Sequence, residues 1–112
     1  QRQMCIRDSF TGVLAANDTM ALGAIKALKE LTYAIPEDVE IIGFDNIGFS
    51  QLCDPPLATI QQPTIEMGRR AADTLIRAIV GNPIETKNIH LQPKLVVRGS
   101  VKTIYGERIL YV

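Results

Sequence analysis

Apolar and polar positions follow two alternating patterns along this chain, and the switches between them predict its elements. Residues 10–16 (FTGVLAA) form a short apolar run that is typical of a strand. Asp18 stands where a helix N-cap is expected, since its side chain can accept hydrogen bonds from the first free backbone N–H groups. Pro36 cannot lie inside the helix that follows. The predicted helix has one apolar stripe at helical spacing, made of Ala21, Ala24, Ile25, Leu28 and Leu31.

A second apolar run, residues 39–44 (VEIIGF), is almost unbroken. Such runs are typical of strands buried on both faces of a parallel sheet that helices cover. Strand, helix and strand in this order predict a right-handed βαβ unit. The chain is therefore expected to be an α/β protein, with a parallel sheet and flanking helices. Residues 45–56 are expected to form a loop.

Further elements follow this loop. Residues 57–62 (LATIQQ) predict a third strand, and Thr64 is expected to cap a second helix that ends at Gly81. Residues 89–92 and 94–99 are expected to be strands. The second helix is expected to bury an apolar face made of Gly68, Ala71, Ala72, Leu75, Ile76 and Ile79.

The two ends of the chain do not share this regularity. Residues 1–9 (QRQMCIRDS) show no clear period and contain no apolar core of a secretory signal. We interpret them as a foreign or artefactual leader, outside the fold. Residues 102–112 are interpreted as a tail of uncertain relation to the domain.

Composition narrows the class of protein. The 112 residues fit one domain, and 12 Lys plus Arg balance 12 Asp plus Glu. This balance argues against a nucleic-acid-binding face, which needs a surplus of positive charge. No apolar run approaches the roughly 20 residues of a membrane span. The two cysteines, Cys5 and Cys53, predict neither a metal cluster nor a disulfide framework, and they indicate a reduced, cytoplasmic setting.

Polar side chains follow the first two predicted strands. Asn17 and Asp18 come after residues 10–16, and Asp45 follows residues 39–44. The carboxyl ends of parallel strands form the ligand-binding edge of open sheets. Asn17 offers a donor and an acceptor and Asp45 offers two acceptors, a combination that suits the hydroxyls of a sugar. Asn and Asp are also common wherever a strand becomes a loop, so the pattern alone leaves both interpretations open.

The sequence does not indicate catalysis. His90 is the only histidine and has no neighbouring Ser or Cys nucleophile. No glycine-rich loop follows a strand in the manner of a phosphate-binding site. We therefore expect a protein that is not an enzyme, without a cofactor or a bound metal.

Three apolar residues lie at positions that are expected to be exposed to solvent. Leu22 lies off the apolar stripe of its helix, and Phe49 and Leu52 lie in the predicted loop. Isolated exposed apolar residues are normal, whereas three near one edge would mark a subunit interface. The pattern alone favours neither interpretation.

Five segments in order and spacing resemble a known family. They are AANDTMALGAIKAL (15–28), IPEDVEIIGFDN (35–46), PPLATIQQP (55–63), EMGRRAADTLIRAI (66–79) and LVVRGS (95–100). Over residues 10–101 the chain resembles the C-terminal part of the effector-binding domain of LacI/GalR-type bacterial transcriptional regulators. That domain is periplasmic-binding-protein-like.

The resemblance implies a fold with two α/β lobes and an effector cleft between them. Residues 10–61 would form the second half of the C-terminal lobe. Residues 62–92 would supply a crossover and a helix of the N-terminal lobe, and residues 93–101 would return as a strand. The chain would thus be a C-terminal fragment of the sensor domain, without the helix-turn-helix module through which such repressors bind operator DNA.

The resemblance also implies roles for individual residues. Those matching effector-binding positions are Asn17, Asp45 and Gln62, and those matching the dimer contact are Leu22, Phe49, Leu52 and Cys53. We therefore expect the sensing part of a cytoplasmic, dimeric transcriptional repressor whose effector is a small molecule of the sugar class. The alternative is a periplasmic sugar-binding protein of a transport system, which shares the fold.

Overall fold

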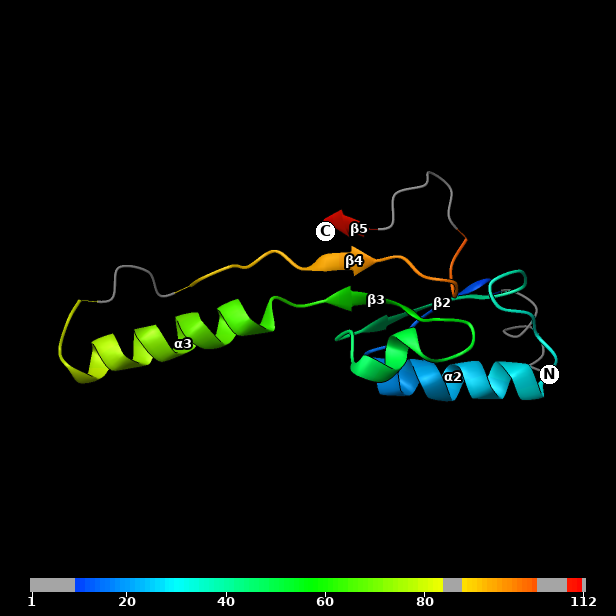
Figure 1. Ribbon diagram of the computed structural model, residues 1–112, viewed down its shortest axis with the longest axis horizontal. Helices are drawn as coiled ribbons and strands as arrows, with labels where there is room; N and C mark the ends of the chain where they lie inside the picture. Colours follow the sequence, from blue (N-terminus) through cyan, green and yellow to red (C-terminus); the bar gives the residue numbers. More distant parts are fainter. Residues whose placement is uncertain (1–9, 84–87, 103–108, 112) are drawn as a thin grey trace.

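The computed structural model describes residues 10–83, 88–102 and 109–111, and Figure 1 shows how its elements follow one another. The interpretation of residues 1–9 as a leader, and most of the predicted tail, lie outside the described residues. The elements are β1 (Gly12–Leu14), α2 (Asp18–Glu30), β2 (Glu40–Phe44), the 3₁₀ helix η1 (Gly48–Gln51), β3 (Ala58–Gln61), α3 (Thr64–Ile79), β4 (Lys94–Val96) and β5 (Ile109–Tyr111).

The strands form one sheet in the order β1-β2-β3-β4-β5. The pairs β1-β2 and β2-β3 are parallel, whereas β3-β4 and β4-β5 are antiparallel. The register places Leu14 opposite Ile42, and Phe44 opposite Ile60. The predicted α/β class and the parallel βαβ unit are confirmed, and antiparallel strands extend the parallel part.

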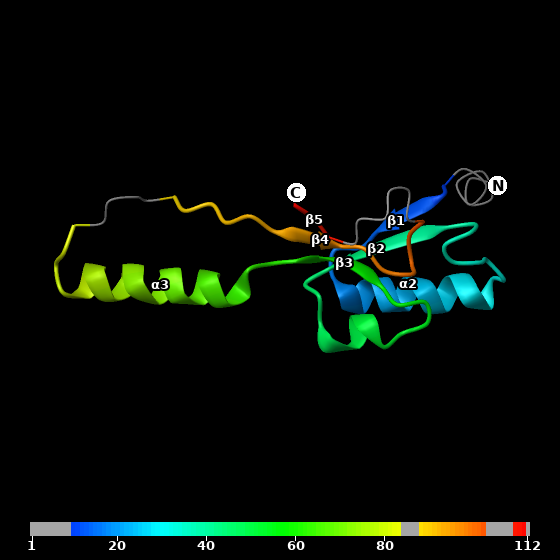
Figure 2. The same cartoon turned by 45° about the horizontal axis from the view of Figure 1, so that its top comes forward.

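The core lies between α2 and one face of the sheet. Figure 2 shows α2 and η1 on the same side of the strands. Three residues of the predicted stripe are buried there, whereas Leu31, the residue after the helix, is 50% exposed. β2 alternates between buried and half-buried positions, because α2 covers only one of its faces in the part of the chain that the structure describes. The buried apolar residues are Ala21, Ile25, Leu28, Val39, Ile41 and Leu57.

Both predicted helix caps are displaced by one residue. Asn17, with extended backbone angles, caps α2 by accepting a hydrogen bond of 2.8 Å from the Met20 backbone N–H. Asp18 is already helical and fully buried, so the prediction that it is the cap is wrong. Thr64 is likewise the first helical residue of α3, behind Pro63, which makes no side-chain capping bond. A sequence places a cap only to within a residue, because several polar residues adjoin the first turn.

α3 extends away from the sheet, as Figures 1 and 2 both show. None of its residues is buried, and its predicted apolar face is open, with Leu75, Ile76 and Ile79 59–73% exposed. The helix ends at Ile79 with Val80 as its C-cap, and Gly81 follows with a positive φ of 80°, which confirms the predicted stop. Among the described residues, the structure contains no helix that is long and apolar enough to cross a membrane.

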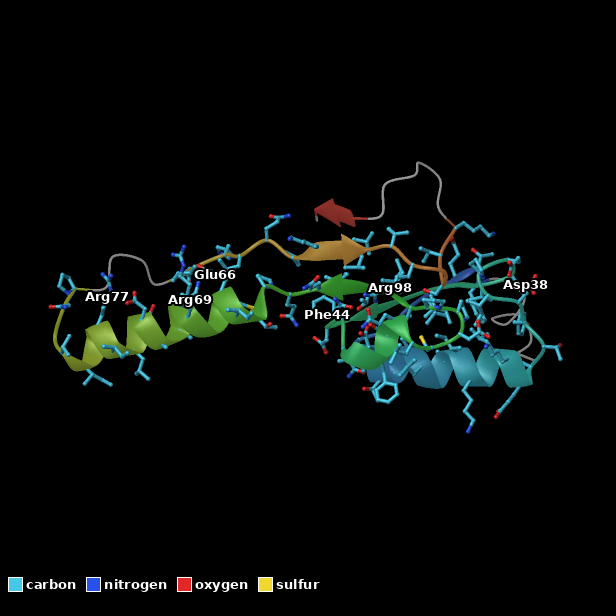
Figure 3. The ribbon with its side chains drawn as sticks, in the orientation of Figure 1. Asp38, Phe44, Glu66, Arg69, Arg77 and Arg98 are labelled. Carbon is cyan, nitrogen blue, oxygen red and sulfur yellow. The ribbon has the colours of Figure 1, made fainter. Side chains whose placement is uncertain are left out.

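The polar side of α3 carries ion pairs, along the stretch that Glu66, Arg69 and Arg77 mark in Figure 3. Arg77 Nε lies 2.9 Å from Asp73 Oδ2, and Arg70 Nε donates to Glu66 Oε1 at 2.8 Å. This hydrogen bond, together with the charges of Arg70 and Arg69, lowers the pKa of Glu66.

The chain returns from α3 to the sheet as an extended segment, residues 88–93. The prediction of a strand at residues 89–92 is wrong, because no strand among the described residues pairs with this segment. β4 is also shorter than predicted, since it ends at Val96 and a turn at residues 99–100 places Ser100 between β2 and the start of β3. There the Ser100 hydroxyl donates to the Ile41 carbonyl at 2.6 Å and accepts from the Ala58 N–H at 2.8 Å.

Candidate functional site

The carboxyl ends of the three parallel strands meet at one edge of the sheet. β1, β2 and β3 are hydrogen-bonded neighbours in that order, and Figure 2 shows them side by side. Asn17 follows β1, Asp45 follows β2 directly, and Gln62 follows β3 directly. The topology therefore delivers all three residues of the predicted effector site to this edge. It is the edge at which open parallel sheets bind ligands.

Asp45 and Gln62 are in direct contact. Gln62 Nε2 donates to Asp45 Oδ1 at 2.8 Å. The Asp45 side chain is exposed and Gln62 is half-buried, so the pair faces solvent from the sheet edge. A carboxylate has acceptor capacity beyond one such bond, and the amide oxygen of Gln62 adds another acceptor. The pair can thus accept hydrogen bonds from neighbouring hydroxyls of a ligand.

Backbone geometry at the end of β2 sets the direction of Asp45. Both Asp45 and Asn46 have positive φ, 106° and 55°, which Asp and Asn tolerate better than most residues. Two bonds to β3 hold this bend: the Asp45 N–H donates to the Ile60 carbonyl at 2.9 Å, and the Asn46 N–H donates to Thr59 Oγ1 at 3.2 Å. Such a backbone costs of order 1–3 kcal/mol and persists only where its surroundings hold it.

Asp18 lies beneath this bend as a buried carboxylate. Its Oδ1 accepts from the Thr59 hydroxyl at 2.5 Å, and its Oδ2 accepts from the Ile47 N–H at 2.9 Å. A Cβ on Gly43 would come within 2.2 Å of Asp18 Oδ1, so only glycine leaves room there. Asp18 is thus a structural link between α2, β3 and the loop after β2.

Arg98 contacts the same loop from the other end of the sequence, and Figure 3 shows it beside the end of β2, which Phe44 marks. Its Nη2 donates to Asn46 Oδ1 at 2.8 Å, and its Nη1 donates to Ser50 Oγ at 3.0 Å and to the Leu57 carbonyl at 2.9 Å. Arg98 is not among the residues predicted from the sequence, because its polar partners are far away along the chain and no local pattern marks such contacts.

Asn17 lies at the same edge but makes a different contact. Its Oδ1 accepts from the Met20 N–H, so this side chain caps α2. It is half-buried, and no hydrogen bond joins it to Asp45 or Gln62 in the described part of the chain. The structure therefore brings Asp45 and Gln62 into contact. Asn17 lies at the same sheet edge because β1 is next to β2, but it does not bond to either residue in the described part of the chain.

The residues predicted to form a dimer contact lie around η1 and α2. Phe49 and Leu52 are 71% and 75% exposed, whereas Leu22 is half-buried against the core. Cys53 is also half-buried, and its thiol lies 3.2 Å from the carbonyl oxygens of Ser50 and Pro55. Two of the four residues thus present large apolar side chains to solvent.

The described residues show no group of three or more His, Cys, Asp and Glu side chains arranged to hold a metal ion. His90 is exposed in the segment between α3 and β4.

Comparison with known proteins shows the family to which the chain belongs. A family model described as a periplasmic binding protein-like domain matches residues 2–101. The chain is 43% identical over 98 residues to the HTH-type transcriptional regulator MalR of Streptomyces coelicolor, covering 88% of this chain and 28% of MalR. It is 41% identical over 103 residues to the HTH-type transcriptional repressor PurR of Mannheimia succiniciproducens, covering 92% of this chain and 31% of PurR. It therefore spans less than a third of these relatives.

Solved structures share the fold. A LacI family transcriptional regulator from Arthrobacter sp. FB24, in complex with lactose, superposes with a TM-score of 0.77 at 32% identity. The match covers 90% of this chain and 39% of that regulator.

Proposed function

Because the chain belongs to the periplasmic binding protein-like domain family and corresponds to the C-terminal part of the sensor domain of LacI-type regulators, we propose that it is the effector-sensing part of a DNA-binding transcriptional repressor. MalR and PurR, which match most of this chain, are both helix-turn-helix regulators by name. These relatives favour a regulator over the alternative, a periplasmic binding protein of a transport system. The relatives are regulators and not enzymes.

The proposed effector site consists of Asp45, Gln62 and Asn17. The observation that carries this assignment is the 2.8 Å hydrogen bond between Gln62 and Asp45 at the carboxyl ends of β2 and β3. A carboxylate next to an amide binds vicinal hydroxyls through charge-assisted hydrogen bonds. The proposed effector is therefore a sugar, and the lactose complex of the Arthrobacter relative is consistent with that class.

Partners follow from the exposed apolar surfaces. Phe49 and Leu52, together with Leu22 and Cys53, are proposed to contact a second copy of the protein in a homodimer. The open apolar face of α3 is proposed to pack in the N-terminal lobe of the sensor, with residues 10–61 in the C-terminal lobe. Operator DNA would be bound by a helix-turn-helix module outside this sequence, in the cytoplasm.

A binding experiment tests the effector site. In a full-length regulator that carries this sequence, Asp45→Ala is expected to weaken binding of the sugar effector by about tenfold to a hundredfold. The reason is that a hydrogen bond to a charged group contributes about 1.5–3 kcal/mol. The measurement is isothermal titration calorimetry with a panel of mono- and disaccharides that includes lactose.

Asp73→Ala, which removes an exposed ion pair on α3, serves as the control and should bind sugars like the wild type. Binding of Asp45→Ala to the regulator's operator DNA should also be unchanged. If Asp45→Ala binds every sugar with wild-type affinity, the assignment of this site is wrong.

A further inference from the structure

One loop carries residues of both proposed contacts. The 45–52 loop begins with Asp45 of the proposed effector site and includes Phe49 and Leu52 of the proposed dimer contact. Its first two residues have positive φ, and η1 forms its second half. A loop with this backbone needs fixed contacts to keep one conformation. The contacts of this loop therefore set the position of the Asp45 side chain.

Arg98 supplies a central group of these contacts. Its guanidinium donates to the Asn46 side chain at 2.8 Å, to the Ser50 hydroxyl at 3.0 Å and to the Leu57 carbonyl at 2.9 Å. Ser50 is fully buried, and its hydroxyl also lies 2.7 Å from the Ile47 carbonyl and 3.2 Å from Asn46 Oδ1. Asn46 and Ser50 of the loop thus form a closed hydrogen-bonded triangle with Arg98.

The position of Arg98 in the fold links this triangle to the other half of the effector site. Arg98 follows β4, which pairs with β3 from Thr59 opposite Val96 to Gln61 opposite Lys94. The next residue along β3 is Gln62, the partner of Asp45. Both the carboxylate and the amide of the site are therefore held against the same pair of strands.

We propose that Arg98 is a positioning residue, whose guanidinium holds the 45–52 loop in the conformation that sets Asp45 against Gln62. This inference rests on the proposed function only for the role of Asp45 in binding the effector. Arginine suits the task because its planar guanidinium presents several donors in fixed directions, whereas the single ammonium of lysine cannot reach three separated acceptors equally well. Arg98 touches no ligand in this scheme and acts through Asn46 and Ser50.

Amide hydrogen exchange in a full-length regulator tests this without any ligand. Arg98→Met is expected to accelerate exchange of the amides of residues 46–53 by about tenfold or more, because local opening no longer breaks charge-assisted hydrogen bonds. Exchange in α2 should stay within about twofold of the wild type. Arg98→Lys, which keeps the charge, should give loop exchange rates between those of the wild type and those of Arg98→Met. The control is Arg77→Met on α3, which should leave the 45–52 loop unchanged.

A second variant approaches the triangle from the other side. Asn46→Ala should accelerate exchange in the same loop. In the double variant Asn46→Ala/Arg98→Met, the acceleration should be smaller than the product of the two single accelerations, because residues in one hydrogen-bonded network are coupled. The proposal is overturned if Arg98→Met leaves loop exchange unchanged, or if exchange rises equally in α2. It is also overturned if the two substitutions act independently.

Sugar binding separates this proposal from the proposed function. If Arg98→Met loosens the loop and also weakens binding of a sugar that requires Asp45, both stand. If the loop loosens while Asp45→Ala binds the sugar panel normally, the effector site is wrong and the positioning role of Arg98 remains.

Discussion

Asp18 and Gly43 are in direct contact, and the carboxylate of the first occupies the space that a side chain on the second would need. An ideal Cβ on Gly43 would lie 2.2 Å from Asp18 Oδ1 and 3.0 Å from the Leu57 side chain. Asp18 cannot move away without losing its bonds to Thr59 and Ile47. The buried carboxylate of Asp18 beneath the candidate site therefore requires glycine at position 43 of β2.

Gly43→Ala should thus destabilise the protein. We expect a loss of about 2–3 kcal/mol in the free energy of unfolding, in the upper range for overpacking a core, because the added methyl displaces a bonded carboxylate. Urea unfolding of a full-length regulator measures it. Gly23→Ala is the matched control, since nothing lies within 4 Å of its added Cβ in α2. It should stabilise the helix by about 0.5–1 kcal/mol, so equal effects of the two variants would contradict the proposed contact.

The two adjacent polar residues at the start of α2 should differ in their effect on stability. Asn17→Ala removes one capping bond and is expected to cost about 1 kcal/mol. Asp18→Ala leaves the Thr59 hydroxyl and the Ile47 N–H unpaired below the sheet, and it should cost about 2–3 kcal/mol. Thermal and urea unfolding of the two variants give the comparison. The reverse order would mean that Asp18 is the cap after all.

Removing the exposed apolar side chains near η1 should change the oligomeric state. The double substitution Phe49→Ser and Leu52→Ser is expected to raise the dimer dissociation constant of a full-length regulator by at least about a hundredfold, because both side chains would leave a buried interface. Analytical ultracentrifugation over a concentration series measures this. Leu31→Ser, which removes a half-exposed side chain at the opposite end of α2, should leave the dimer intact. A dimer of unchanged affinity in the double variant would exclude this surface.

Acid should weaken the first turn of α3. The hydrogen bond from Arg70 lowers the pKa of Glu66, so the folded pKa lies below the unfolded one. The resulting stabilisation is present above the unfolded pKa and is lost as the pH falls through the folded value. An NMR titration should find the midpoint of Glu66 below that of an unpaired glutamate, and Arg70→Gln should raise it. A midpoint that does not respond to this substitution would show that the pair does not form.

Much of the local structure follows from residue pattern alone. The apolar run of β2 and the helical spacing of Ala21, Ile25 and Leu28 predict the βαβ unit that the structure contains. The place of Asp45 at the end of β2, and of Gln62 at the end of β3, follows from the same pattern once the strands are parallel. These features depend on residues that are near one another in the chain, and spacing reports such relations directly.

Tertiary structure decided which polar groups meet. The bond from Gln62 to Asp45 spans 17 residues, the bond from Thr59 to Asp18 spans 41, and the bond from Arg98 to Asn46 spans 52. Asp18 looked like a cap because its local sequence fits one, and only the burial of α2 against β3 gave its carboxylate other partners. Sequence spacing carries the period of helices and strands, but contacts between distant residues arise only when the sheet assembles.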